Sequence, residues 1–408
     1  MKLLLKLFPC FLGAVFLFIT FAETVPVCLA SEIPAANQLI QNGGYALSKN
    51  GRIIRSANGD IPFIPASTIK LVTSLAALEI LGPDFRFHTR IYLDEKSNLI
   101  IQGLGDPFLV SEKVDTIVKL VAEQGITKIK HIILDDYAFA LDSPVDGSKN
   151  SKRPYDASCS ALAVNFNSLP LRVLHEAKVK SSESQTPYLP IMGQIGRNLS
   201  SGFHRVNIDA FPKQTVLSNS LLYCGQLFQA FFEKHGIQVG GNIKHGRVTA
   251  NTQPLLDFIA SETVSELVES CLLSSNNFMA NQLYLALGVK KYGLPATWQK
   301  SRDVMETFIK KELQLDKKQL TMVEGSGISQ KNRITPEAML LVLEHFRNYA
   351  ALIPIKYGTR MKSGTLPKSG IFCYAGYIPN GEENGSFVIF LNQKRNRRDK
   401  ILKLLYRQ

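Results

Sequence analysis

Ser67 and Lys70 form the first pair of residues that could carry out chemistry, in the stretch PASTIKLVTSLAALEILG (65–82). Residues three apart lie on one face of a helix, so the hydroxyl and the ammonium group should meet at its first turn, where backbone N–H groups lack intrahelical partners. A serine becomes nucleophilic when a neighbouring base takes its proton, and a lysine can be that base where apolar surroundings disfavour its charged form. The largely apolar remainder of the stretch supplies such surroundings, and Gly82-Pro83 ends the helix.

A second polar cluster, Ser274-Ser275-Asn276-Asn277, interrupts an apolar helical stretch at 265–288. Serine and asparagine side chains compete with helical hydrogen bonds, so four of them in a row predict a break in the helix. We expect a hydroxyl and an amide at this break to point into a site. A simple junction between two helices is the alternative interpretation.

A third cluster, Lys362-Ser363-Gly364-Thr365, lies in a predicted strand that continues through 372–378. Glycine within a strand often marks the close approach of another backbone. A cation and hydroxyl groups beside it favour the docking of an extended, anionic peptide, although a solvated strand end has the same composition.

The composition is that of a globular protein of two or three domains, with 408 residues, 45% hydrophobic and 20% charged. Residues 1–30 differ from the rest, because two lysines precede an apolar run at 7–22 and the small residues Ala22 and Ala30 offer cleavage sites. This pattern predicts a cleavable secretory signal and a periplasmic location. A membrane anchor is disfavoured because the run is short and contains Pro9.

Basic residues exceed acidic ones, 47 against 34, which gives a net charge of +13. This excess favours anionic partners, such as peripheral contact with a membrane or with anionic wall polymers. Nucleic acid is not expected, because no groove-reading motif is present.

Four cysteines lie outside the predicted signal, and their spacing specifies no disulfide pairing: Cys159, Cys224, Cys271 and Cys373. The seven histidines show no zinc-binding spacing, so we predict no metal site. The glycines of the turn at 103–107 lack phosphate-loop spacing, and we expect no cofactor.

The secondary-structure pattern predicts strands on both sides of Asn50-Gly51, a strong hairpin signal, before the helix that carries Ser67. Strands and a helix then alternate over about 90–210, which indicates an inserted domain because the flanking segments each lack a complete core. Helices resume at 220–236, and a basic amphipathic helix that covers the sheet closes the chain. The predicted division of the chain is 1–30 for the signal peptide, 31–90 and 211–408 for the two parts of one domain, and 91–210 for the insertion.

The order Ser-x-x-Lys, Ser-x-Asn, Lys-(Ser/Thr)-Gly is the signature of penicillin-recognising serine acyl enzymes. Together with GLGDPFL, PYDASCSALAVNFN and EGSGISQKNRITP, it makes nearly the whole chain after the signal resemble the D-alanyl-D-alanine carboxypeptidase/endopeptidase family, the class C penicillin-binding proteins of DacB type. The resemblance implies an α/β (α+β) fold: a transpeptidase-like, β-lactamase-like domain with an antiparallel sheet flanked by helices, plus a large inserted α/β domain.

The resemblance also implies a role for each motif residue. Ser67 would attack the D-Ala-D-Ala carbonyl of peptidoglycan stem peptides, with Lys70 as general base, and Ser275 would relay the proton to the leaving D-alanine. Backbone N–H groups of Ser67 and Thr365 would form the oxyanion hole. The implied substrate-binding residues are Asn277 for the peptide amide and Lys362, Ser363, Gly364 and Thr365 for the terminal carboxylate.

Two positions depart from the commonest form of the motifs, Ser363 where threonine is usual and Asn276 where aspartate is usual. Neither change removes a group that the chemistry needs. The acidic residues with which the family holds the amino end of the stem peptide have no clear match, and Asp156 is one candidate.

The resemblance implies a serine-type carboxypeptidase that β-lactam antibiotics inhibit covalently. A serine β-lactamase is one alternative, although no acidic loop motif for a deacylating water is found and the large insertion is out of place there. A catalytically silent wall-binding scaffold is the other, and the intact motif residues argue against it.

Overall fold

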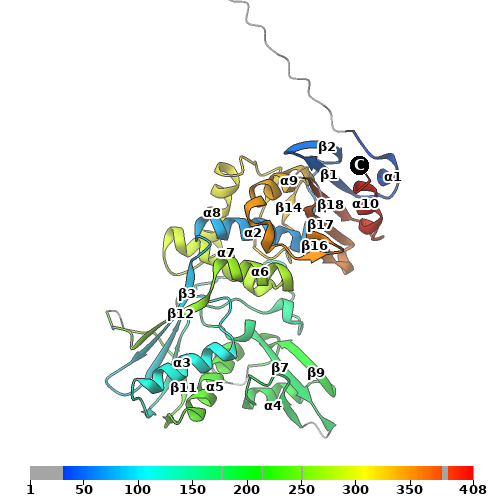
Figure 1. Cartoon of the computed structure of the whole chain (residues 1–408). Helices are drawn as coiled ribbons and strands as arrows, with labels where there is room; N and C mark the ends of the chain where they lie inside the picture. The colour runs from blue at the N-terminus through cyan, green and yellow to red at the C-terminus, as the bar shows by residue number, and fades with distance from the viewer. Residues whose placement is uncertain (1–30, 176–177, 214, 250, 379–384, 408) are drawn as a thin grey trace, which may run out of the picture.

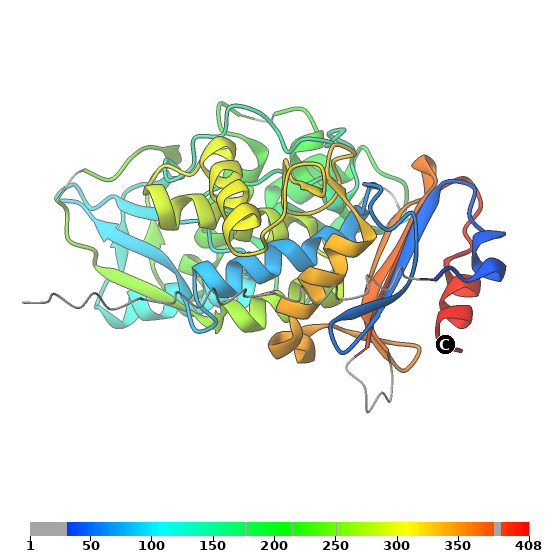
Figure 2. The ribbon, with the colours of Figure 1, turned by 90° about the horizontal axis from the view of Figure 1, so that it is seen from above.

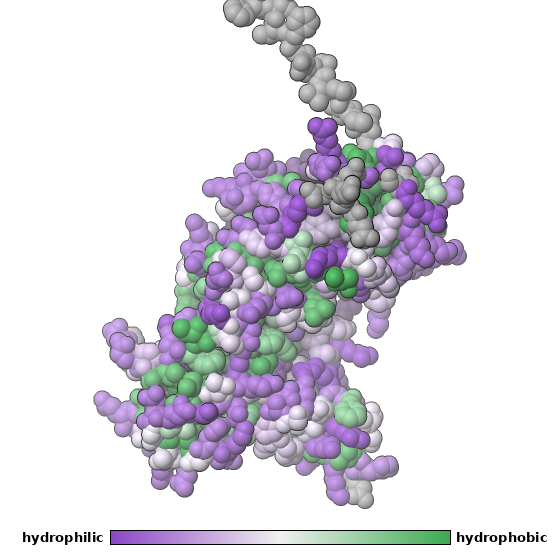
Figure 3. Space-filling view, in the orientation of Figure 1, coloured by the Kyte–Doolittle hydropathy of each residue, from purple (hydrophilic) through white to green (hydrophobic). Residues whose placement is uncertain are grey.

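The computed structural model describes residues 31–175, 178–213, 215–249, 251–378 and 385–407. The predicted signal at 1–30 and most of a hairpin that the sequence predicts at 380–385 therefore lie outside the described residues. Figure 1 shows two regions: one holds the two ends of the chain, and the other is built from its middle. Hydrophilic side chains cover most of the face seen in Figure 3, with smaller hydrophobic patches between them.

The first region is built on a six-stranded antiparallel sheet, which is seen nearly edge-on in Figure 2. In spatial order its strands are β15 (Ile355–Lys356), β16 (Thr359–Leu366), β17 (Ile371–Tyr377), β18 (Ser386–Asn392), β1 (Gly43–Lys49) and β2 (Arg52–Ala57). Strand β1 from one end of the chain pairs with β18 from the other, with Tyr45 opposite Ile389. The expected domain sheet made from both ends of the sequence is confirmed.

Helices cover both faces of this sheet, because its central strands are apolar on both sides. On one face lie α2 (Lys70–Ile80), α6 (Val264–Ser274), α7 (Asn277–Tyr292), α8 (Trp298–Lys311) and α9 (Pro336–His345). On the other lie α1 (Pro34–Asn37) and α10 (Arg398–Leu405). Val388 and Phe390 pack in the first core and Phe387, Ile389 and Leu391 in the second. The prediction that the basic C-terminal helix covers the sheet is confirmed.

Three further short elements of this region lie near the start of α2. A 3-10 turn, η1 (Ala66–Ile69), precedes α2 directly, and β13 (Leu320–Thr321) pairs with β14 (Arg333–Ile334). The chain between β13 and β14 is the loop 322–332. Thr335 caps α9 by accepting a hydrogen bond from the backbone N–H of Ala338, and Pro336 occupies the first helical position.

The second region holds a mixed five-stranded sheet in the order β11 (Ile243–His245), β6 (Ile132–Asp135), β4 (Leu99–Gly103), β3 (Arg86–Leu93) and β12 (Leu256–Thr263). A three-stranded antiparallel sheet lies beside it, with β7 (Ser168–Val173) between β8 (Val179–Ser181) and β9 (Gly202–Asn207). The remaining elements are α3 (Ser111–Glu123), α4 (Pro190–Gly196), α5 (Asn219–Lys234) and the pair β5 (Lys128–Ile129) and β10 (Gln238–Val239).

This second region extends beyond the expected insertion at 91–210. Strand β12 pairs with β3, and the apolar residues of α5 pack into the core of the second region. The sequence shows that α5 is apolar, but not which core receives its side chains. The boundaries of independent folding units at 91 and 210 stay a prediction.

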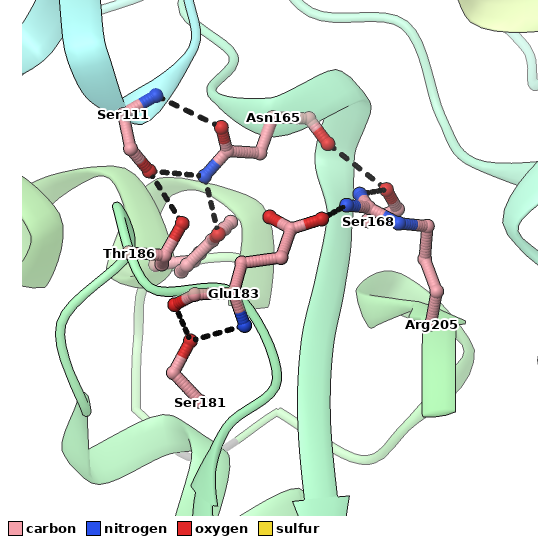
Figure 4. A network of polar contacts seen from close by, with 8 residues as sticks. Ser111, Asn165, Ser168, Ser181, Glu183, Thr186 and Arg205 are labelled. Atoms are coloured by element: carbon pink, nitrogen blue, oxygen red, sulfur yellow. Dashed lines mark hydrogen bonds and ion pairs between the residues drawn. The ribbon is translucent and has the colours of Figure 1, made fainter. Parts of the chain in front are cut away.

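A closed polar network ties the second region together (Figure 4). Asn165 accepts a hydrogen bond from the backbone N–H of Ser111 at 3.0 Å and donates to the Ser111 hydroxyl at 2.9 Å. Glu183 and Arg205 form an ion pair, and Arg205 also donates to Ser168. We call the residues labelled there the Figure 4 network: Ser111, Asn165, Ser168, Ser181, Glu183, Thr186 and Arg205.

Among the described residues, no helix has the length and apolar character needed to cross a membrane. The four cysteines outside the signal are free thiols. One strand prediction is wrong: the third motif does not continue through 372–378 as a single strand. Pro367 and a left-handed Gly370 (φ 69°) turn the chain, so β16 and β17 pair as antiparallel neighbours.

Candidate active site

Ser67 lies in the 3-10 turn at the start of α2, partly exposed, next to the fully buried Lys70. The Lys70 Nζ lies 3.1 Å from the Ser67 Oγ, so the expected meeting of the two side chains at the first turn is confirmed. Ala66, just before the serine, has a positive φ of 47°. A non-glycine residue in this conformation carries backbone strain of the kind found at functional sites.

Three acceptors surround the Lys70 Nζ: the Ser67 Oγ, the Asn277 Oδ1 at 2.7 Å and the carbonyl oxygen of Ser326 at 2.6 Å. They match the three N–H bonds of an ammonium group. A neutral amine has two N–H bonds, which Asn277 and Ser326 can hold, and its lone pair then faces the serine hydroxyl. The site is therefore built so that Lys70 can donate to Ser67 when charged and accept its proton when neutral.

The electrostatics of this pocket favour the neutral amine. Burial lowers the pKa of Lys70 from 10.5 to about 8, while the Cys271 thiol and the Glu324 carboxylate oppose that shift. A lysine with a pKa near 8 is partly neutral at physiological pH, as a general base requires. Lys70 thus has both the position and the proton affinity for this role.

The second motif lies at a helix break, as predicted. Helix α6 ends at Ser274, Ser275 adopts a left-handed conformation (φ 56°), and Asn276 caps α7 by accepting from the backbone N–H of Met279. The break brings Ser275 and Asn277 to the site from two different helices. Asn277 uses its carbonyl oxygen for Lys70, and its Nδ2 donates to the backbone carbonyl of Tyr155 at 3.0 Å.

The third motif lies on β16, which runs beside η1. Lys362 is 3% exposed, and its Nζ donates to the Ser275 Oγ at 2.8 Å. Burial lowers its pKa to about 7, and the ammonium groups of Lys70 and Lys356 act in the same direction. Ser275 therefore lies against a lysine that holds its proton weakly.

Gly364 explains why the third motif can approach the serine so closely. A Cβ at this position would lie 2.5 Å from the carbonyl oxygen of Pro65 and 2.9 Å from the backbone nitrogen of Ser67. The predicted close approach of another backbone at this glycine is confirmed. The approach brings β16 beside the backbone N–H of Ser67, one of the two groups expected to form an oxyanion hole.

The structure adds three contacts that the sequence reasoning missed. Arg398 donates to the Thr365 Oγ1 at 2.8 Å, and Lys356 donates to the Ser363 Oγ at 3.1 Å. The third contact is the Ser326 carbonyl on Lys70. The only sequence signal was indirect: Ser326 lies in a conspicuous glycine-rich turn and Arg398 in the basic C-terminal segment.

Asp156, the candidate for stem-peptide recognition, is buried and faces its own loop. Its carboxylate accepts hydrogen bonds from the backbone N–H groups of Lys149 and Ser151. These contacts give it a part in shaping the loop that presents the Tyr155 carbonyl to Asn277. Within the described ranges, no group of three metal-ligating side chains could hold a metal ion.

One protein-family model and several known proteins are similar in sequence to this chain. A family model described as the D-Ala-D-Ala carboxypeptidase 3 (S13) family matches residues 39–196 and 206–358. A D-alanyl-D-alanine carboxypeptidase of Actinomadura sp. (strain R39) is 25% identical over 430 residues, which span 88% of this chain and 79% of that protein. The D-alanyl-D-alanine carboxypeptidase DacB of Haemophilus influenzae is 23% identical over 91% of this chain and 89% of its own.

Solved structures show the same fold. Penicillin binding protein 4 (dacB) from Haemophilus influenzae superposes with a TM-score of 0.74 and 20% identity, over 91% of this chain and 98% of that one. Its complex with a β-lactam gives a TM-score of 0.67. The Bd3459 predatory endopeptidase from Bdellovibrio bacteriovorus is more distant, with a TM-score of 0.51 and 15% identity over 89% of this chain and 90% of its own.

Proposed function

Since the chain belongs to the D-Ala-D-Ala carboxypeptidase 3 (S13) family, we propose that Ser67 is the nucleophile with which it cleaves the D-Ala-D-Ala bond of peptidoglycan stem peptides. The chain is a penicillin-binding serine DD-peptidase. The observation that carries the assignment of the nucleophile is the 3.1 Å contact between the Ser67 Oγ and the Nζ of the buried Lys70.

In the acylation step, the Ser67 Oγ forms a bond to the carbonyl carbon of the penultimate D-alanine, and Lys70 takes the hydroxyl proton. The tetrahedral oxyanion would accept hydrogen bonds from the backbone N–H groups of Ser67 and Thr365. Removing one donor of such a pair typically costs about 10²- to 10³-fold in rate. The closeness of β16 to Ser67 at Gly364 supports this arrangement.

The leaving group needs a proton when its C–N bond breaks. Ser275 would donate to the amine of the departing D-alanine, and Lys362, 2.8 Å from its hydroxyl, would replace the proton or stabilise the charge that develops there. In deacylation a water molecule attacks the acyl-serine ester. The ester bond breaks, Ser67 regains its hydroxyl proton and the shortened stem peptide leaves.

The substrate-binding roles follow from the groups that the motifs present. Ser363 and Thr365 offer hydroxyls to the terminal carboxylate, and Lys362 supplies positive charge beside them. Arg398 donates a hydrogen bond to the Thr365 hydroxyl, and Lys356 donates one to the Ser363 hydroxyl. One N–H bond of the Asn277 amide can donate to a carbonyl of the bound peptide while the other meets Tyr155.

A β-lactam would acylate the same serine, because its strained amide occupies the position of the scissile bond and its carboxylate the position of the substrate terminus. Penicillin binding protein 4 from Haemophilus influenzae, which shares this fold, has been crystallised in complex with a β-lactam. We propose that such inhibitors form a long-lived ester on Ser67. A β-lactamase would differ by hydrolysing that ester rapidly.

Location and further contacts follow from the sequence outside the site. The signal-like residues 1–30 support export to the periplasm, where peptidoglycan is found. The net charge of +13 supports peripheral contact with anionic wall polymers or membrane lipids. We also propose that the middle of the chain, expected at 91–210, folds as a unit inserted into the catalytic domain.

Release of D-alanine from a pentapeptide stem by the purified chain without residues 1–30 tests the proposal. Ser67→Ala should abolish the release. Ser261→Ala, which changes an exposed serine of the second region, should leave it unchanged. Hydrolysis that persists in Ser67→Ala at the wild-type rate would rule out the acyl-serine mechanism.

A further inference from the structure

Glu324 is a fully buried carboxylate beside the active site that none of the three motifs includes. It lies in the loop 322–332, at 0% exposure. One carboxylate oxygen accepts from the backbone N–H of Gly327 and from Asn332 Nδ2, each at 2.7 Å. The other accepts from the backbone N–H and the hydroxyl of Ser326 at 2.7 and 2.6 Å. Among the described residues it forms no ion pair, so its charge is balanced by hydrogen bonds from its own loop.

The loop that Glu324 organises contacts Lys70 and the residue that precedes Ser67. The carbonyl of Ser326 accepts from Lys70 Nζ at 2.6 Å. At Gly327, with φ 85°, a Cβ would lie 2.0 Å from the carbonyl oxygen of Ala66, the residue before the serine. Such a contact leaves room for glycine alone. The loop thus fixes Lys70 by a hydrogen bond and presses against the turn that presents Ser67.

Other contacts fix the same loop without contributing charge. The Thr73 Oγ1 donates to the carbonyl of Gly325 at 2.7 Å, and the backbone N–H of Gly325 donates to the Asn281 Oδ1 at 2.8 Å. Thr73 is buried on α2, one helical turn beyond Lys70. It therefore offers a control that disturbs the position of the loop and leaves the carboxylate in place.

The charged and titratable groups around Lys70 come from three directions. Cys271 faces it from α6, Lys362 from β16 and Glu324 from the loop 322–332. Glu324 is the carboxylate among them, and its charge opposes the effect of burial on Lys70. A negative charge in this position stabilises the ammonium group that forms when Lys70 takes the proton of Ser67.

We propose that Glu324 is a positioning residue for acyl transfer: it folds the loop 322–332 so that the Ser326 carbonyl holds Lys70, and it places a negative charge on the side of the lysine that faces this loop. This inference rests on the proposed function only for its consequence in catalysis. The effect on Lys70 itself exists whether or not the enzyme turns over.

The experiment is an NMR titration of Lys70 in protein labelled with ¹³C at lysine Cε, with its signal assigned by its loss in Lys70→Met. In Glu324→Gln the midpoint should move to lower pH by roughly one unit, the lower end of the range for losing a neighbouring opposite charge. Thr73→Val should leave the midpoint within about 0.3 units of the wild type, because it removes a hydrogen bond and no charge. An unmoved midpoint in Glu324→Gln, or an equal shift in Thr73→Val, overturns the proposal.

Glutamine cannot accept from all the donors around this position, so Glu324→Gln can fail to fold. Glu324→Asp then carries the test, because it keeps the charge and withdraws the carboxylate by one methylene. We expect its Lys70 midpoint to stay in place and its acylation by a fluorescent penicillin to slow by roughly tenfold or more, as positional errors near reacting groups do. Wild-type acylation in Glu324→Asp contradicts the positioning role.

The two proposals fail in different ways. If wild-type protein is not acylated at Ser67 but Lys70 still titrates lower in Glu324→Gln, the proposed function is wrong and the effect of Glu324 on Lys70 stands. If acylation at Ser67 is normal and the Lys70 midpoint does not respond to Glu324→Gln, the function stands and this inference is wrong.

Discussion

Two polar networks in this protein serve different ends. The Figure 4 network contains an ion pair of opposite charges, Glu183 with Arg205, and one of its hydrogen bonds reaches the Tyr223 hydroxyl. The site network, defined as Ser67, Lys70, Ser275, Asn277 and Lys362, contains two buried lysines and no carboxylate. Its hydrogen bonds reach two partly exposed serine hydroxyls, those of Ser67 and Ser275, and also the backbone carbonyls of Ser326 and Tyr155.

The difference shows how a fold can separate stability from chemistry. A network that pairs its charges and satisfies its donors holds elements in place. In a network with two buried lysines and no carboxylate, burial lowers the pKa of each lysine, so that each can exist partly as the neutral amine near neutral pH. Substitutions in one network should therefore leave the other unchanged.

Replacing Lys70 with methionine should give the largest effect. Without the base, acylation by a fluorescent penicillin should fall by about 10²- to 10⁴-fold. Three acceptors lose their donor while a costly buried cation disappears, so we expect the free energy of unfolding to stay within about 2 kcal/mol of the wild type. Stopped-flow acylation and urea denaturation measure the two quantities. A loss of stability without a loss of acylation rate would show that Lys70 serves stability and not chemistry, which contradicts the contrast between the two networks.

Replacing Asn165 with glycine should have the opposite effect. Its amide donates to Ser111 and to the Tyr223 hydroxyl, and its φ of 48° suits glycine, so the change removes the side chain without backbone strain. We expect a loss of about 2 to 3 kcal/mol in the free energy of unfolding, because buried partners are left unsatisfied. The folded protein should be acylated at the wild-type rate. Asn150→Gly, which changes an exposed asparagine whose φ of 47° also suits glycine, is the matched control.

The pH dependence should follow the site network. Acylation should fall about tenfold per pH unit below about 8, the pKa to which burial lowers Lys70. Burial lowers the pKa of both lysines, so between about pH 7 and 9 the unfolded chain binds protons that the folded lysines have lost. The free energy of unfolding should therefore rise with pH over this range. Lys70→Met should lack its share of that rise. A rate that begins to fall only below pH 5 would exclude Lys70 as the base.

The smallest effect is expected at Lys356. This side chain is exposed and donates to the Ser363 hydroxyl at 3.1 Å. Lys356→Met should change the acylation rate by less than about tenfold and the free energy of unfolding by less than about 0.5 kcal/mol, since exposed charges contribute little. A larger effect on acylation would show that Lys356, on the exposed strand β15, is a functional part of the site network.

The local features of the site could be predicted from the sequence. Ser67 and Lys70 are three apart in an apolar helix, and four consecutive serine and asparagine residues break a helix, as the structure confirms. Gly364 marked a close backbone approach, which is also confirmed. Each of these rests on a short-range rule of backbone geometry.

What the sequence could not provide depends on long-range packing. The Ser326 carbonyl is a backbone group, and no residue type indicates that such a group will contact Lys70. The apolar residues of α5 do not indicate which of the two cores they enter. In the structure they enter the core of the second region, which therefore extends further along the chain than expected. Arg398 contacts Thr365 only because α10 folds back over the sheet. These contacts follow from the topology rather than from any local pattern.

The most direct measurement is covalent labelling of the purified chain, without residues 1–30, by a fluorescent penicillin, with the labelled peptide mapped by mass spectrometry. We predict a single ester on Ser67 that is released slowly and is absent from Ser67→Ala. Rapid release would instead indicate a β-lactamase. Folded wild-type protein that takes up no label, or takes it up at another residue, would contradict the assignment of Ser67 as the nucleophile.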